Sequence, residues 1–379
     1  MLGLDPATTP PACRLGMDRT RQRSLAYLPV EKGACARALQ LVEKADSAYE
    51  RLVNADDSEA LHDFRVAVRQ LRTLVRTYDP YLTIGKKRRQ ALRRLAKKTS
   101  TARDLEVTLD WLSAQRGALD PSERMGLDHL MAKLKQRCEH AYGLIRKRVP
   151  SEWNGLEAGL VKRLGRGLPE QPESGTFAQV SAVVADRYCD ELESALRTLN
   201  GTMNNELAHQ VRICGKRLRY VLEPFRKAVD GAQEAAVALK RLQDDLGALC
   251  DSHVATEELM SSTAAMVGER ARRLVALELA SETENTHLES EKRRDVMPGL
   301  LALARLAKAR HTMLSAKVKR RHLASRTLIS GIRKVTKRLR AIVAPKAPSR
   351  TKPQVRHDGT TQKPRAPRRA TARTRNRKS

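Results

Sequence analysis

An internal repeat constrains this chain more than any other feature. His62 and His209 stand 147 residues apart, and sliding the chain by that distance aligns its two halves without a gap. Both copies carry the pattern HxxRxxx[RK]xLR, which reads HDFRVAVRQLR in the first half and HQVRICGKRLR in the second. Self-similarity at a fixed offset is the mark of a repeated structural unit. We therefore expect each half to contain the same unit.

Composition indicates that this unit is helical. Aromatic residues make up only 3% of the chain, whereas β-sheets are rich in aromatic and β-branched residues. Apolar residues recur with helical spacing from Glu31 onward, and the 41% of hydrophobic residues suffice for packed cores. We predict an all-α protein in which each half forms a bundle of about four helices.

Breaks in the helical pattern define the organisation of the chain. The joint richest in Gly and Pro, Gly165–Thr176, separates a first helical half (29–165) from a second half with a C-terminal helical extension (176–343). Residues 1–28 are expected to be poorly ordered, and residues 344–379 to be disordered. Further breaks are expected at 54–58, 83–85, 99–101, 117–121, 200–204, 230–231 and at Gly247.

The repeated helix places its cations on one face. At 100° per residue, His62, Arg65, Arg69 and Arg72 fall within an arc of about 80°, and apolar residues occupy the opposite side. The second half repeats this column with four side chains: His209, Arg212, Lys216 and Arg219. Like charges at these spacings repel one another. A solvated face with dispersed charges would normally mix signs, so two such columns favour the binding of a long anion.

A second group of cations follows in the first half only. Residues 86–98 contain eight Lys and Arg and no acid, among them Arg89, Arg93 and Lys97. The corresponding segment of the second half keeps Lys240 and Arg241 but gains three acids. We therefore expect the first half to contribute more positive charge to an anion site.

Net charge points to the same class of partner. The chain carries 73 Lys and Arg against 43 Asp and Glu, for a net charge of +30. Residues 344–379 hold twelve of these cations and one acid, so that the remainder is basic in its own right. The aromatic residues sit at core spacings rather than where bases would stack, which favours a polyanion without bases.

Motifs of several other functional classes are missing from the sequence. Nucleotide-binding loops, HExxH, GxSxG and Cys/His metal spacings do not occur, so we expect no cofactor, no metal and no catalytic residue. The six scattered cysteines form no CxxC pair, which indicates reduced thiols. No apolar stretch approaches the roughly 18 residues that span a bilayer, and the first 30 residues lack the apolar segment of a signal peptide. We expect a cytoplasmic protein without membrane insertion.

Four segments of the sequence resemble the CHAD family, the conserved histidine α-helical domain. In chain order these are LHDFRVAVRQLR, ARDLEV, AHQVRICGKRLRYVLEPF and LKRLQDDLGALCD. The resemblance covers about residues 28–320. It implies two antiparallel helical bundles related by a pseudo-two-fold axis, with a basic groove or pore that binds inorganic polyphosphate. Relatives are associated with polyphosphate granules.

The resemblance also assigns residues to the binding site. The family histidines fall at His62 and His209, and its Arg-Asp pair falls at Arg103 and Asp104, whereas the second copy has Cys250 before Asp251. The basic positions of the family fall at Arg65, Arg69, Arg72, Arg212, Lys216, Arg217 and Arg219. The ExExK motif of the triphosphatase domain that some relatives carry is missing from the sequence, so that activity is not implied.

Three hypotheses of function follow. The leading one is a non-enzymatic polyphosphate-binding protein at polyphosphate granules, with granule proteins as further partners. The second is a nucleic-acid-associated protein whose basic C-terminal segment coats DNA or RNA without sequence preference. The third is a phosphohydrolase acting on polyphosphate or a nucleotide, although the sequence offers no identifiable carboxylate cluster for a metal.

Overall fold

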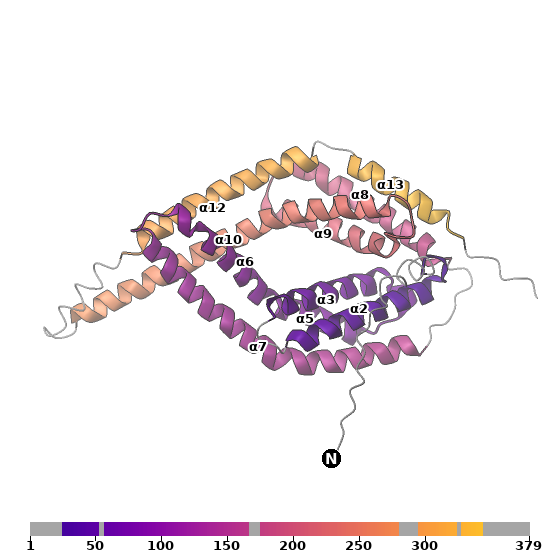
Figure 1. The fold of residues 1–379 in the computed structure, drawn as a ribbon, viewed down its shortest axis with the longest axis horizontal. Helices are drawn as coiled ribbons and strands as arrows, with labels where there is room; N and C mark the ends of the chain where they lie inside the picture. The colour runs from indigo at the N-terminus through magenta and orange to yellow at the C-terminus, as the bar shows by residue number, and fades with distance from the viewer. Residues whose placement is uncertain (1–24, 53–56, 167–174, 280–294, 324–326, 344–379) are drawn as a thin grey trace, which may run out of the picture. The chain divides into compact units, whose positions relative to one another are not determined.

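The computed structural model describes residues 25–52, 57–166, 175–279, 295–323 and 327–343 (Figure 1). All regular elements of these residues are helices, which confirms the all-α prediction, and the described β-structure is limited to one isolated bridge between Pro29 and Thr176. The predicted disorder of residues 344–379, and of residues 1–24 in the N-terminal segment, lies outside the described residues. Both helical halves belong to one compact unit, Met1–Ala344.

The helices follow one another in two series. The first half contains α2 (Val30–Leu52), α3 (Ser58–Thr77), α4 (Asp79–Leu82), α5 (Lys86–Lys98), α6 (Ser100–Gln115), η1 (Arg116–Ala118) and α7 (Arg124–Gly165). The second half contains α8 (Phe177–Gly201), α9 (Asn205–Leu222), η2 (Glu223–Phe225), α10 (Ala232–Leu279), α12 (Met297–Val318), η4 (Lys319–Leu323) and α13 (Thr327–Arg340).

Corresponding helices begin at the offset of the sequence repeat. α2 and α8 begin at residues 30 and 177, and α3 and α9 begin at 58 and 205, so both pairs differ by 147. In the first half α2, α3, α5 and α7 pack in a ring, and α8, α9, α10 and α13 do so in the second. These are the two four-helix bundles expected. Their origin by duplication and the pseudo-two-fold axis stay predictions.

Two hydrophobic cores hold the helices together. The larger one runs through both bundles, where α2 meets α8 and α3 meets α9, and it includes Phe64, Trp153, Phe177 and Phe225. The smaller core lies among α6, α7, α10 and α12, beyond the bundles. Because apolar side chains of both halves share the larger core, burial of apolar surface holds α3 and α9 against each other.

Local signals set where the principal helices begin. Asp57 caps α3, accepting hydrogen bonds from the backbone N–H of Glu59 and Ala60, and Thr176 forms a capping box with Gln179 at the start of α8. Residues 25–28, which were predicted to be poorly ordered, belong to the described residues. Leu25 and Ala26 are buried, and Ala26 packs in the larger core.

The predicted break at Gly247 is wrong. α10 continues through this residue, and a Cβ added there would lie 3.5 Å from Nε of Arg212. The missing side chain therefore gives room to a neighbouring guanidinium rather than forming a turn. In the first half the chain does break at the corresponding place, where Thr99 separates α5 from α6.

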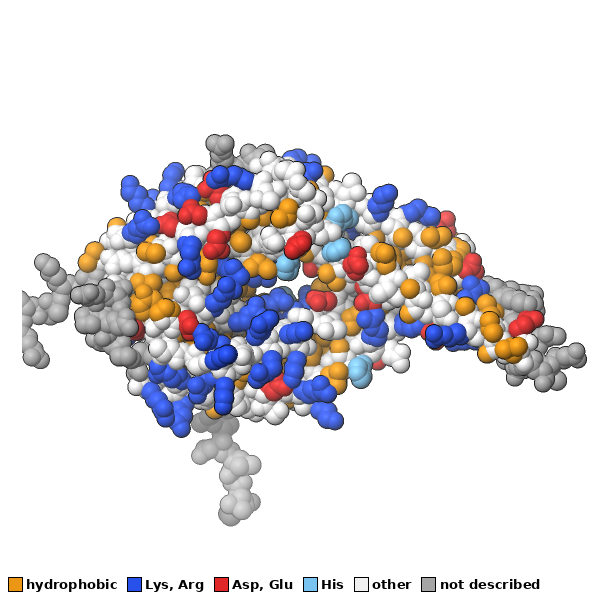
Figure 2. Space-filling view, turned by 180° about the vertical axis from the view of Figure 1, so that it is seen from behind, with side chains coloured by type: hydrophobic (Ala, Val, Ile, Leu, Met, Phe, Trp, Pro, Cys, Tyr) orange, Lys and Arg blue, Asp and Glu red, His pale blue; other side chains and the backbone are white. Residues whose placement is uncertain are grey.

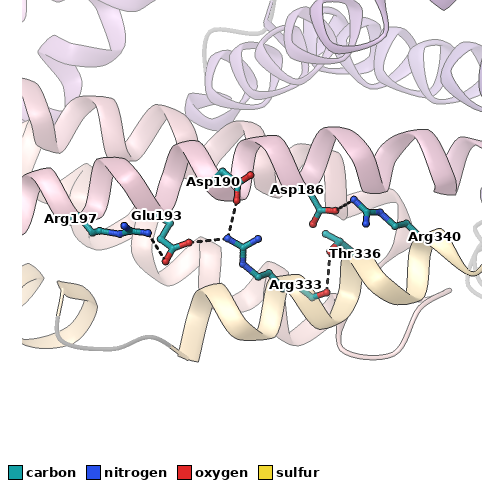
Figure 3. Close-up of polar contacts among 7 residues, drawn as sticks. All are labelled: Asp186, Asp190, Glu193, Arg197, Arg333, Thr336 and Arg340. Carbon is teal, nitrogen blue, oxygen red and sulfur yellow. Dashed lines mark hydrogen bonds and ion pairs between the residues drawn. The ribbon is translucent and has the colours of Figure 1, made fainter.

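The C-terminal helix closes the second bundle against α8 (Figure 3). Nη2 of Arg333 contacts Oδ1 of Asp190 at 2.8 Å and Oε2 of Glu193 at 2.9 Å, and Arg340 pairs with Asp186. The hydrogen bonds from Arg333 and Arg197 lower the pKa of Glu193. Beneath these exposed pairs, Ile332, Val335 and Leu339 are buried, so apolar packing provides most of the attachment.

Candidate anion-binding site

Apolar packing determines which way the repeated cations face. On α3, Phe64, Val68 and Leu71 are buried in the larger core, and on α9 the residues Val211 and Leu218 are buried in the same way. α3 of the first bundle and α9 of the second lie next to each other in the middle of the molecule (Figure 1). Figure 2 shows Lys and Arg side chains crowded on one side of a hollow there, with acidic and His side chains on the other.

Six predicted cations form what we call the inner cation cluster. They come from α3, α6 and α9 and are close enough for their charges to interact across the two halves. Burial, with repulsion between neighbours, lowers the pKa of four of them, bringing Arg65 to about 10 and Lys216 to about 7. The members of the cluster are Arg65, Arg69, Arg72, Arg103, Arg212 and Lys216.

Five of these six cations form no ion pair within the described residues. Arg103 pairs with Glu106 at 3.0 Å, whereas none of the ion pairs in the part of the chain that the structure describes includes any of the other five cations. Nη1 of Arg65 and Nε of Arg212 are buried without a hydrogen-bond partner, and only 3% of Arg65 is exposed. Buried polar groups normally have partners, so these donors are available to an anion.

Two aspartates face the cluster without neutralising it. Asp104 on α6 and Asp251 on α10 occupy equivalent positions of the repeat. Burial raises the pKa of both carboxyl groups, and nearby arginines, Arg65 beside Asp104 and Arg212 beside Asp251, only partly oppose this effect. Asp104 is exposed to solvent, yet the surrounding protein still desolvates its carboxyl group. Together with Glu106, which bonds to Arg103, these are three acids against six cations, so the site stays positive.

Several uncharged contacts hold the second column in place. Gln243 donates from Nε2 to the backbone oxygen of Gly215 at 3.1 Å and accepts at Oε1 from Nε of Arg219, also at 3.1 Å. The guanidinium of Arg219 lies 4.9 Å from the ring centroid of Tyr220. These contacts fix the orientation of Arg219 without cancelling its charge.

Four further predicted residues border the cluster. Arg93 and Arg217 are close enough to Arg72 to lower its pKa, although burial has the larger effect, and Arg217 also lies 3.9 Å from Glu191. Arg219 contributes to the repulsion felt by Lys216 and lies 3.9 Å from Glu223. Burial, followed by repulsion from Arg212 and Lys216, lowers the pKa of His209.

The remaining four predicted residues do not join the cluster. Arg89 is paired with Asp79, and Nζ of Lys240 bonds to Oδ2 of Asp244 at 2.7 Å, so nearby acids neutralise both cations. Lys97 is exposed on α5, and His62 is half-buried on α3. Within the described residues no hydrogen bond or ion pair joins Lys97 or His62 to the inner cation cluster.

Two further members of the site were not among the predicted site residues. The sequence analysis named Asp251 as the counterpart of Asp104 but did not assign it to the site. Arg310 on α12 lies outside the repeat, yet it faces Asp251 and stacks 5.5 Å from the ring of Trp111. Helical periodicity offers no signal for Arg310, because its position depends on how α12 packs against α10 and α7.

Two other kinds of site find no support in the described residues. No three His, Cys, Asp or Glu side chains there come together as a metal centre requires. None of the helices described is both long and apolar enough to cross a bilayer. The cations of the inner cation cluster can donate hydrogen bonds to an anion and attract its charge.

Comparison with known proteins identifies the family. The crystal structure of the CHAD domain from the plant Ricinus communis resembles this fold with a TM-score of 0.54 and 20% identity, over 85% of this chain and 95% of that chain. No curated protein matches the chain. The family model for the CHAD domain matches residues 36–260, which include the repeated helices and both aspartates. Because this match spans more than half of the chain, the protein belongs to the CHAD domain family.

Proposed function

We propose that this protein binds inorganic polyphosphate at the inner cation cluster and does not turn it over. The observation that supports this most directly is the set of five cluster cations that form no ion pair within the described residues. Four of them are buried or half-buried, namely Arg65, Arg69, Arg212 and Lys216, and Arg72 is exposed. Arginine forks bind phosphate oxygens through two parallel hydrogen bonds, and lysine acts as a point charge. A chain of linked phosphates offers such oxygens at regular intervals to both columns at once.

The site favours a phosphate chain over a nucleic acid. The aromatic side chains near the cluster are engaged in the protein: Phe64 and Tyr78 are buried, and Tyr220 lies under Arg219. Binding of single-stranded nucleic acid relies on exposed rings on which bases stack. Polyphosphate needs no such rings, and we propose that granules of this polymer are where the protein acts, in the cytoplasm.

A triple variant tests the site. Arg69→Gln, Arg212→Gln and Lys216→Gln together remove the centre of the cluster, and a charged hydrogen bond contributes about 1.5–3 kcal/mol. We expect the affinity for labelled long-chain polyphosphate to fall at least about 100-fold at 150 mM salt. The matched control changes three exposed lysines of α7, Lys135, Lys147 and Lys162, to Gln. Equal losses in both variants would show that binding follows net charge alone.

The second candidate function is binding of DNA or RNA through residues 344–379. Its support is the charge of that segment, with twelve cations and one acid, which lies outside the described residues. Competition experiments on the full chain separate the two functions. If the segment binds nucleic acid and the cluster binds polyphosphate, the triple variant keeps its affinity for duplex DNA and RNA while losing polyphosphate. Release of phosphate by the purified protein with magnesium or manganese would contradict the non-enzymatic proposal.

A further inference from the structure

Lys216 occupies the most repulsive position of the inner cation cluster. Arg212 and Arg219 flank it on α9, and Arg65 and Arg69 face it from α3. Lys216 corresponds to Arg69 of the first half. It is the one lysine of the inner cation cluster, whose other five members are arginines. Arginine keeps its proton under nearly all conditions, whereas the lysine amine loses its proton readily when it is buried among cations.

The groups around Lys216 decide whether it can hold a proton in the empty site. Besides the four arginines, His209 on α9 and Cys250 on α10 lie near it. The acidic side chain that opposes the repulsion is Asp251 on α10, which is itself shared with Arg212, Arg310 and Arg103. Asp104 on α6 faces Arg65 and Arg69 instead. No described acid forms an ion pair with Lys216.

Resting on the function proposed above, we infer that above neutral pH Lys216 is largely uncharged in the empty site and takes up a proton when polyphosphate binds. A bound phosphate chain supplies negative charge directly to the four arginines and to the amine. It thereby removes the repulsion that disfavours the ammonium form. Polyphosphate and a proton then bind together, and the site is less repulsive when it is empty.

The burial of Lys216 sets the pH range of this coupling. Desolvation, followed by repulsion from Arg212, Arg69, Arg219 and Arg65, lowers the pKa of the amine from its ordinary 10.5 to about 7. Above pH 7 the empty site therefore lacks this proton, while the occupied site holds it. Linkage requires the affinity to fall as pH rises, by about 50-fold between pH 7 and pH 9 when the occupied site restores the ordinary value.

Calorimetry in two buffers of different ionisation enthalpy measures this proton directly. The ligand is long-chain polyphosphate, because only its terminal phosphates titrate near neutral pH. His209→Asn serves as the background in every sample, since the neighbouring imidazole could also gain a proton. We expect uptake of about one proton per binding site at pH 8 in this background.

Lys216→Arg is the decisive substitution because it keeps the cation and removes the titration. The doubly substituted protein should bind polyphosphate with no proton uptake and with the same affinity at pH 7 and pH 9. Lys162→Arg, an exposed change on α7, should leave the uptake unaltered.

The possible failures are distinguishable. Tight binding without proton uptake, or uptake that persists after Lys216→Arg, overturns this inference and leaves the binding function standing. Absence of binding at every pH overturns the proposed function and the inference with it.

Discussion

Replacing Lys216 by Met should stabilise the protein in the absence of ligand. The lysine side chain is half-buried in α9 among four arginines, and its pKa of about 7 compares with an ordinary value of 10.5. At pH 7 the unfolded chain holds the proton firmly, whereas the folded protein holds it only half of the time. This difference costs the folded state about 4 kcal/mol at pH 7. Met has a similar length and no charge, so Lys216→Met removes most of that cost.

The sign of the pH dependence provides an internal check. Between pH 7 and about 10.5 the Lys216 amine binds more protons in the unfolded state than in the folded state, so the destabilisation that this lysine causes decreases as pH rises over this range. The advantage of Lys216→Met should therefore be largest at pH 7 and below and should shrink toward pH 10. Lys162→Met, at an exposed position of α7, should change the free energy of unfolding by no more than about 0.5 kcal/mol.

Urea unfolding at pH 7 and pH 9.5, monitored by circular dichroism, measures these differences. Saturating polyphosphate should reverse the order, because the ligand stabilises only the protein that binds it well. A Lys216→Met protein that is no more stable than the unsubstituted one at pH 7 would refute the reasoning. It would mean that the lysine keeps its proton in the folded state at little cost.

Two other predictions concern the framework of the site. Asp245→Asn should destabilise the protein by about 3 kcal/mol in urea unfolding. The buried carboxylate of Asp245 pairs with Nζ of Lys317 at 2.7 Å and with Nε2 of His322 at 2.8 Å, and the substitution would leave both nitrogens without an anionic partner. A loss below about 1 kcal/mol would contradict this prediction. Gly299→Ala should lower the free energy of unfolding by about 1–3 kcal/mol, because its Cβ would lie 2.0 Å from the backbone oxygen of Glu123. Gly268 has open space around it, so Gly268→Ala should stabilise α10 slightly. Similar effects at both glycines would refute this argument.

The sequence was sufficient for the helical class and for the faces of α3 and α9. Both follow from local rules: spacing of Phe64, Val68 and Leu71 gives the buried face, and the cations lie on the other. The offset of 147 then predicted which helices correspond. Because these signals lie within one helix or repeat in register, they do not depend on how distant helices pack.

Long-range packing explains what the sequence did not reveal. The pair of Lys240 with Asp244 is an exception, because it is local to α10 and the sequence already contains it. Arg89, by contrast, meets Asp79 of another helix, α4. Arg310 enters the site only because α12 packs against α10. Ion pairs between different helices decide which cations remain available to an anion. A single sequence does not show which side chains of different helices meet.

The unpaired cations and the larger core lie on opposite faces of the same two helices, α3 and α9. Confining Arg65, Arg69, Arg212 and Lys216 together opposes folding, since burial and mutual repulsion both disfavour their charges. Stabilisation must come from the same helices, and α3 and α9 bury apolar side chains along their opposite faces. An anion that enters the site removes the repulsion while leaving the apolar contacts intact. Ligand binding and folding stability are thus coupled through two faces of one helix pair, and substitutions that neutralise the cluster should raise stability as they weaken binding.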